Sequence, residues 1–134
     1  MRSAEGLPPG AANYITAEGA ARLREELARL RRNVGAEPKQ TAELERVVAS
    51  VTIVEAPEEP STSVAFGARV TLRDAAGELQ TYRIVGVNEL ELFADAVSWI
   101  SQLGRSLLAA ELNDRITLPN GELGRVIKIE YPGA

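Results

Sequence analysis

The stretch VSWISQLGRSLLAAEL, residues 97–112, decides the fold of this chain. It begins with a short apolar run, continues with Ser101, and then places leucines at helical spacing, at positions 103, 107, 108 and 112. This pattern predicts a strand that leads directly into an amphipathic helix. Ser101 is suited to cap that helix, because its side-chain oxygen can accept hydrogen bonds from free N–H groups of the first turn. Gly104 and Ser106 thin one face of the helix, so another surface can approach closely there.

Strand-like sequence precedes this helix. Apolar and polar residues alternate in residues 66–73 and 79–86, and the turn sequence DAAG, residues 74–77, lies between them. These features predict a β-hairpin. Residues 88–96 mix leucine and phenylalanine with acidic residues, and they leave a loop, a strand and one helical turn open as interpretations.

Two further strands are predicted after the helix, in residues 115–118 and 123–131. The dipeptide Asn120-Gly121 between them is a strong signal for a tight β-turn. The second of these strands is expected to place alternate residues on one face: Leu123, Arg125, Ile127, Ile129 and Tyr131. Together with the preceding hairpin, these strands predict an antiparallel sheet that packs against one helix.

The first half of the chain predicts a pair of helices. Thr16 is an N-cap candidate for a helix that runs to about Asn33. Apolar residues recur in it at the spacing of a helix–helix seam: Leu23, Leu27, Leu30 and Val34. Gly35 and Pro38 favour a turn and a new helix start. A second apolar stripe follows them: Leu44, Val47, Val48 and Val51. We therefore expect a short antiparallel helical hairpin.

These patterns predict three parts in the chain. Residues 1–13 are rich in Gly, Pro and Ala, and they are expected to form a flexible leader. The helical hairpin is assigned to residues 14–57, with a short strand at the β-branched residues 52–54, and the sheet domain to residues 58–134. The acidic, proline-containing sequence EAPEEPSTS, residues 55–63, is the expected linker between hairpin and sheet.

The composition restricts the chemistry that the chain can perform. Its 134 residues carry a net charge of −4, so no domain-wide basic field favours general binding to nucleic acid. The absence of cysteine and histidine excludes a disulfide, a thiol nucleophile, an imidazole base and the usual zinc sites. The N-terminal sequence lacks the apolar core of a signal peptide, and no run approaches the roughly 20 apolar residues of a membrane span. We expect a cytoplasmic protein that has no membrane contact and no cofactor.

The order of these segments resembles the bacterial transcript-cleavage factors of the Gre type. The most specific motifs are FGARVTL with TYRIVG, within residues 66–86, and LGRSLL followed by Asn113-Asp114. The resemblance covers the chain from Asn13 onward, and the short hairpin is also similar to that of the Rnk-type regulators. It implies an α+β fold, in which a short N-terminal antiparallel coiled coil precedes an FKBP-like antiparallel sheet domain with one packed helix.

The resemblance also implies a mode of action. In Gre factors the C-terminal domain docks on the rim of the RNA polymerase secondary channel, and the coiled coil enters the channel. Two acidic residues at the coiled-coil tip then help the polymerase to hold a catalytic magnesium ion, which promotes cleavage of backtracked RNA. The present hairpin lacks the tip segment that carries this acidic pair, and its turn offers only Glu37. Because one carboxylate is a poor ligand set for a metal ion, we expect a polymerase-binding regulator with no catalytic residue, no metal site and no stimulation of cleavage.

The resemblance carries candidate docking residues over to the start of the predicted helix: Ser101, Gln102, Gly104 and Arg105. Two positions depart from the family pattern, since Gln102 replaces the usual proline and Ile100 replaces a polar residue. We expect these departures to alter the docking surface and the choice of partner.

Three other interpretations stay open. Arg24, Arg31 and Arg32 of the first helix are candidates for weak RNA contact, as a basic patch is thought to make in Gre relatives, although Glu25 and Glu26 neutralise part of this face. Some FKBP-like proteins are prolyl isomerases, which need an aromatic-lined cleft, and this chain has few aromatic residues. A general protein-interaction module is the third interpretation. No oligomeric state follows from the sequence.

Overall fold

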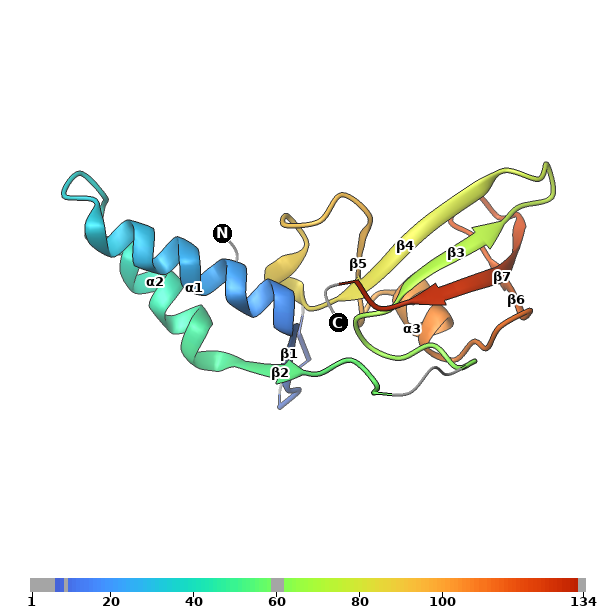
Figure 1. The fold of residues 1–134 in the computed structure, drawn as a ribbon, viewed down its shortest axis with the longest axis horizontal. Helices are drawn as coiled ribbons and strands as arrows, with labels where there is room; N and C mark the ends of the chain where they lie inside the picture. The colour runs from blue at the N-terminus through green and yellow to red at the C-terminus, as the bar shows by residue number, and fades with distance from the viewer. Residues whose placement is uncertain (1–6, 9, 59–61, 133–134) are drawn as a thin grey trace.

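The computed structural model describes residues 7–8, 10–58 and 62–132. A helical hairpin forms one end of the molecule and a five-stranded sheet forms the other, so the chain is a mixed α+β protein (Figure 1). Parts of the predicted leader and linker lie outside the described residues, and the described linker residues 55–58 form neither helix nor strand. Within the described part of the chain, no helix has both the length and the apolar character that a membrane span needs.

The hairpin consists of α1 (Ala17–Arg32) and α2 (Pro38–Ser50). Thr16 caps α1 as predicted, because its hydroxyl oxygen accepts a hydrogen bond from the Gly19 N–H. The prediction that Val34 belongs to the apolar seam is wrong, since α1 ends two residues earlier and Val34 lies fully exposed in the turn. The rest of the seam is buried between the two helices: Leu23, Leu27, Leu30, Leu44 and Val47.

A two-stranded parallel sheet closes the base of the hairpin (Figure 1). Its strands are β1 (Asn13–Thr16), which leads into α1, and β2 (Val51–Val54), which follows α2. The β-branched residues of β2 predicted a strand there, whereas no pattern predicted β1, because it is short and its partner lies far along the chain. Ile15 of β1 is fully buried. Backbone hydrogen bonds therefore hold the two ends of the hairpin together.

The larger sheet has the strand order β5-β4-β3-β7-β6. Its strands are β3 (Arg69–Arg73), β4 (Leu79–Val85), β5 (Ala96–Ser98), β6 (Arg115–Thr117) and β7 (Leu123–Glu130). Both predicted β-hairpins are confirmed, since β3 pairs with β4 and β6 with β7 in antiparallel fashion. Gly77 and Gly121 adopt positive φ angles of 83° and 88° in the turns, a conformation that glycine reaches without strain.

The prediction of a wholly antiparallel sheet is wrong at one edge, where β5 runs parallel to β4. Residues 86–95 connect the two strands and run back along the sheet. As a result, Ala96, the first residue of β5, pairs with Arg83 of β4. This connection contains the 3₁₀ helix η1 (Val87–Glu89), followed by turns. The segment that the sequence left open is thus a crossover with one helical turn.

Helix α3 (Gln102–Leu108) packs against the sheet and completes the core. Leu107 is fully buried together with residues of β3, β4 and β7: Val70, Leu72, Ile84 and Val126. The helix is shorter than predicted, because the chain turns back after Ala109. Leu112 therefore lies outside the helix and is 36% exposed.

Strand β7 contains a bulge that changes which of its residues face the core. The register between β3 and β7 shifts by one residue, and Ile127 is the extra residue. Before the bulge, Val126 is fully buried and Arg125 is exposed; after it, Ile129 and Tyr131 pack against the core. The prediction that all alternate residues of this strand share one face is wrong, because a bulge interrupts the two-residue period.

The Glu89 carboxyl group joins the hairpin to the sheet domain. It is fully buried, and its Oε2 accepts hydrogen bonds from the N–H groups of Gly86 (2.7 Å) and Thr16 (2.9 Å), while the Thr16 hydroxyl donates to Oε1. Gly19 leaves room for this group, since a Cβ at that position would lie 2.0 Å from Oε1. Burial raises the pKa of Glu89, and these hydrogen bonds and the charge of Arg83 offset only part of that effect.

Arg83 makes a second buried contact between the two parts. Its side chain is 2% exposed, forms an ion pair with Glu18 of α1 at 3.0 Å, and donates to the carbonyl oxygen of Pro132 at 3.3 Å. The guanidinium also lies 4.2 Å from the centre of the Phe93 ring. A buried charge is tolerated only where it is paired in this way, so the contact restricts how α1 can sit against β4.

The raised pKa predicts that the contribution of Glu89 to stability depends on pH. A folded-state pKa above the unfolded value means that this contribution is fully present at acid pH and falls as the pH rises from about 4.5 through the folded pKa. Glu89→Gln cannot titrate, so the unfolding free energy of the wild type minus that of the variant should decrease with rising pH. Urea unfolding at a series of pH values measures this difference. Glu91→Gln, at an exposed position of the same segment, is the control, and a difference for Glu89→Gln that stays constant would contradict the assignment.

Candidate docking site

The start of α3 is built around Ser101. Its hydroxyl oxygen accepts a hydrogen bond from the Gly104 N–H at 3.0 Å, and the hydroxyl donates to the Ser98 carbonyl oxygen at 2.7 Å. The first of these bonds confirms the predicted N-cap. The second ties the helix start to the end of β5, so the main contacts of Ser101 lie within the fold.

Gly104 is buried at the same junction. A Cβ at this position would lie 2.0 Å from the Ser98 carbonyl oxygen, so only glycine allows the helix to approach the end of β5 this closely. The sequence indicated a close approach at this face. The structure shows that the neighbouring surface is the chain's own backbone, so Gly104 positions the start of α3 against the end of β5.

Gln102 and Arg105 are the exposed members of the candidate set. Arg105 borders an open depression of about 510 Å³ whose wall is otherwise largely apolar: Pro8, Trp99, Ile100, Leu108 and Ala109. Ile100, which departs from the Gre pattern, thus contributes apolar surface beside an exposed guanidinium. Such a combination suits a protein partner, because interfaces are enriched in aromatic and arginine side chains.

Trp99 links this depression to the base of the hairpin. The centre of its ring lies 5.1 Å from that of Tyr14 in β1, and the Tyr14 ring also contacts Phe66 at 6.0 Å, both in edge-to-face geometry. The Trp99 Nε1 atom is buried and has no hydrogen-bond partner among the described residues. No motif in the sequence marked Trp99 as a site residue, although it is the only tryptophan in a chain with few aromatic residues.

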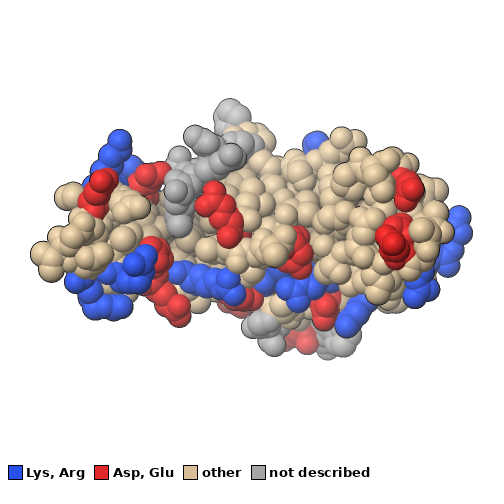
Figure 2. Space-filling view, turned by 90° about the horizontal axis from the view of Figure 1, so that it is seen from above, with Lys and Arg blue, Asp and Glu red and all other residues tan. Residues whose placement is uncertain are grey.

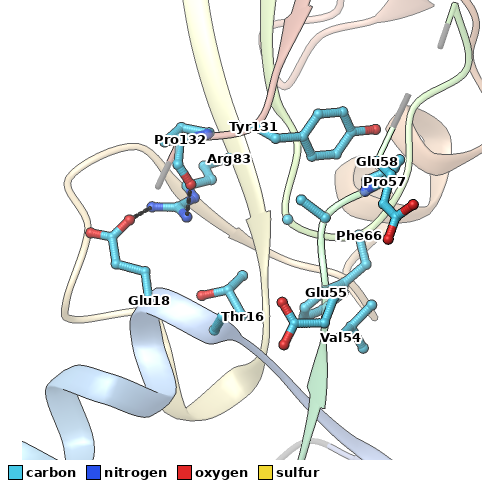
Figure 3. Close-up of a pocket in the computed structure, with 13 residues that line it drawn as sticks. Thr16, Glu18, Val54, Glu55, Pro57, Glu58, Phe66, Arg83, Tyr131 and Pro132 are labelled. Atoms are coloured by element: carbon cyan, nitrogen blue, oxygen red, sulfur yellow. Dashed lines mark hydrogen bonds and ion pairs between the residues drawn. The ribbon is translucent and has the colours of Figure 1, made fainter. Parts of the chain in front are cut away.

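A second hollow, of about 340 Å³, lies between the start of α1, the linker and the ends of β4 and β7 (Figure 3). Arg83 lies at its edge and points toward Glu18 and Pro132, with which it is already paired. Phe66 and Tyr131 supply the only aromatic side chains of its lining. Burial raises the pKa of Tyr131, whose hydroxyl oxygen accepts a hydrogen bond from Ala65 N–H. Arg83 is already paired, and two aromatic rings are too few to form the aromatic-lined cleft that a prolyl isomerase needs.

Carboxylates of the described residues also line the second hollow. Glu55 and Glu58 of the linker are exposed at its rim, and Glu18 is paired with Arg83 (Figure 3). Nowhere among the described residues do three or more His, Cys, Asp or Glu side chains gather closely enough to hold a metal ion.

The arginines considered for RNA contact lie on the exposed side of α1. Arg31 forms an ion pair with Glu45 of α2 at 3.0 Å, whereas Arg24 and Arg32 form none with the described residues. Arg24 and Arg31 are seven residues apart, about two helical turns, so they share one side of the helix, whereas Arg32 is turned from Arg31 by about 100°. Figure 2 shows Lys and Arg side chains along one side of the molecule, with acidic side chains among them.

The chain belongs to the GreA/GreB family, because residues 59–131 match the family described as "Transcription elongation factor, GreA/GreB, C-term". It is 46% identical over 83 residues to the transcription elongation factor GreB of Pseudomonas aeruginosa, covering 60% of this chain and 49% of that protein. It is 36% identical over 89 residues to GreB of Neisseria meningitidis, covering 64% and 55%. The chain thus spans about half the length of the curated relatives it matches.

A solved structure of a GreA/GreB elongation factor from Nitrosomonas europaea is also similar, with 24% identity, a TM-score of 0.49, and coverage of 88% of this chain and 98% of that one. At these values the match adds nothing to the family assignment.

The geometry at Gly104 predicts a loss of stability in Gly104→Ala. The added methyl group must displace the Ser98 carbonyl, so we expect the free energy of unfolding to fall by about 1–3 kcal/mol, despite the better helix propensity of alanine. Chemical denaturation measures this loss. Gln102→Ala in the same helix is the matched control and should change stability by no more than about 0.5 kcal/mol. Equal effects of the two substitutions would contradict the close approach.

Proposed function

We propose that this chain binds RNA polymerase at the rim of the secondary channel and regulates transcription without stimulating transcript cleavage. The observation that carries the proposal is the family match over residues 59–131, which contain the whole five-stranded sheet and α3. Arg105 exposes a charged group beside an apolar depression, and Gln102 exposes a polar group in the same turn of α3, as a docking edge requires. In this proposal Ser101 and Gly104 hold the edge in place.

The hairpin supports the second half of the proposal. Its turn carries a single acidic residue, Glu37, which is exposed and makes no capping hydrogen bond through its side chain. A hard divalent cation needs several oxygen ligands held in place, and one mobile carboxylate offers too few. Helix α1 has 16 residues and reaches only about 24 Å at 1.5 Å per residue. The chain would then occupy the outer channel and compete there with longer factors.

The same resemblance supports four finer proposals. We take residue 58 as the boundary between hairpin and sheet domain, and we assign the sheet domain to the FKBP-like class on its single packed helix. A polymerase partner would place the protein in the cytoplasm. Arg24 and Arg32, which have no ion-pair partner among the described residues, are the candidates for a weak RNA contact beside the channel.

Two alternatives receive less support. A prolyl isomerase would need an aromatic cleft, and the hollow beside Arg83 offers only Phe66 and Tyr131. A general interaction module would not require the Gre motifs in their order. The family match favours the polymerase-binding interpretation over both.

Substitution of Arg105 tests the docking edge. Arg105→Glu reverses an exposed charge beside the apolar depression, and we expect it to weaken binding to core RNA polymerase about tenfold. Pull-down and titration against the core enzyme at low salt measure the change. Lys128→Glu makes the same charge reversal on the exposed face of β7 and should bind as the wild type does. No retention of the wild type on the polymerase would refute the proposal.

An assay on backtracked elongation complexes tests the missing cleavage activity. Alone, the chain should leave the rate of RNA cleavage at the polymerase's own level, because Glu37 cannot complete a metal site. Added to a full-length Gre factor, it should lower the stimulated rate as its concentration rises, by occupying the same site. Stimulation by the chain alone would contradict the first expectation, and indifference to its concentration would contradict the second.

A further inference from the structure

Three arginines form a row across the far end of the sheet. Arg125 of β7 lies directly opposite Arg73 of β3 on one side and Arg115 of β6 on the other. Directly paired residues of antiparallel strands point to the same face, and neighbouring strands lie about 4.8 Å apart. All three side chains are exposed, because the core residues of these strands occupy the opposite face. We call these three residues the arginine row.

No acidic side chain within the described residues forms an ion pair with the arginine row. The acidic residue of the same groove is Asp74, and its carboxylate accepts hydrogen bonds from the turn that it starts, from Ala76 N–H, Glu78 N–H and the Gln80 side chain. Like charges directly opposite one another destabilise a sheet. The arginine row therefore lowers the stability of the fold, and no ion pair with a described residue offsets this cost.

Apolar surface lies among these charges. The arginine row lines an open groove of about 380 Å³ together with Leu123, Gly124 and Ile127. Leu123 is 55% exposed, and Leu79, which lies opposite Arg73 on β4, is 59% exposed. Figure 2 shows Lys and Arg side chains at this end of the molecule, at the opposite end from the hairpin. Arg73 and Arg125 lie on the face of the sheet away from α3, whereas Arg115, at the edge of the sheet, also lines a hollow that it shares with Gln102 of α3.

We propose that the arginine row is a docking surface for a protein segment that carries carboxylates and apolar side chains. A guanidinium presents a planar fork of N–H donors that matches a carboxylate in a bidentate pair. Three such forks across three strands fit acidic side chains of one extended or helical segment, and the exposed leucines cover its apolar residues. The binding of carboxylates removes the repulsion within the row.

Nucleic acid fits this surface less well. The groove has no aromatic side chain on which a base could stack. Exposed acidic residues also lie in the two turns at this end of the sheet, Glu78 before β4 and Glu122 before β7, where they would repel a phosphate chain that continues past the arginines. A short acidic protein segment can end before it reaches these turns.

Titration followed by NMR tests the proposal on the full chain without any polymerase, so its result is independent of the polymerase proposal. The probe is a short synthetic peptide of glutamate and leucine, compared with its glutamine counterpart and with a single-stranded RNA oligonucleotide. We expect the glutamate peptide to shift the amide signals of Arg73, Arg115 and Gly124, and to bind less tightly as salt is added. The glutamine peptide should produce no such shift.

Variants of the arginine row decide where the peptide binds. The triple substitution R73Q/R115Q/R125Q should weaken binding about tenfold or more, since each lost arginine removes charge-assisted hydrogen bonds. A control, R29Q/K39Q/R46Q, removes the same number of charges at exposed positions of the helical hairpin and should keep the affinity. The triple variant should also unfold at a higher temperature than the wild type at low salt, because the repulsion is gone. If the triple variant does not fold, R73Q/R125Q replaces it.

Three results would overturn the proposal. The first is peptide binding that is absent or equal in the row variant and the wild type. The second is RNA binding that depends on the arginine row while the glutamate peptide does not bind. The third is a row variant that unfolds at the same or a lower temperature than the wild type at low salt.

Discussion

The buried carboxyl group of Glu89 determines how the two parts of this protein meet. It packs against the start of α1, where it accepts hydrogen bonds from N–H groups of both parts of the chain. It also accepts a hydrogen bond from the Thr16 hydroxyl, which caps the helix. A buried carboxyl without these donors would be strongly unfavourable, so the hairpin and η1 must lie in one relative position for the contact to form. The neighbouring ion pair between Arg83 and Glu18 also restricts the position of the hairpin relative to the sheet.

Helix caps and turn residues, which are signals within a few neighbouring positions, predicted much of the fold. Thr16 and Ser101 could be identified as caps, because a cap depends on a side chain and the next three residues. The turns at Gly77 and Gly121 were predictable for the same reason. Glu89 was not, since it stands in a mixed segment among other acidic residues and its partner Thr16 lies 73 positions away. Nothing in the local pattern distinguishes a buried carboxyl from a solvated one.

The regular spacing of apolar residues predicted the helices and strands less well where an element ends or its period is interrupted. The seam spacing extended to Val34, but spacing alone does not show where a helix stops. The alternation in β7 is interrupted by Ile127, because a bulge adds one residue without any fixed signature in sequence. At the candidate docking edge, the Ser101 cap and the leucine spacing correctly predicted the start of α3. The family motif could not separate Ser101 and Gly104, which hold the backbone, from Gln102 and Arg105, which face solvent.

The parallel pairing of β1 with β2 makes the hairpin a closed loop of chain whose two ends are fixed side by side. Residues added to α1 and α2 in equal numbers, about seven to each arm, would preserve the facing of the seam and leave the base untouched. The length of the two helices can therefore change through matched insertions alone, while the sheet domain, its core and the surfaces that it presents stay as they are.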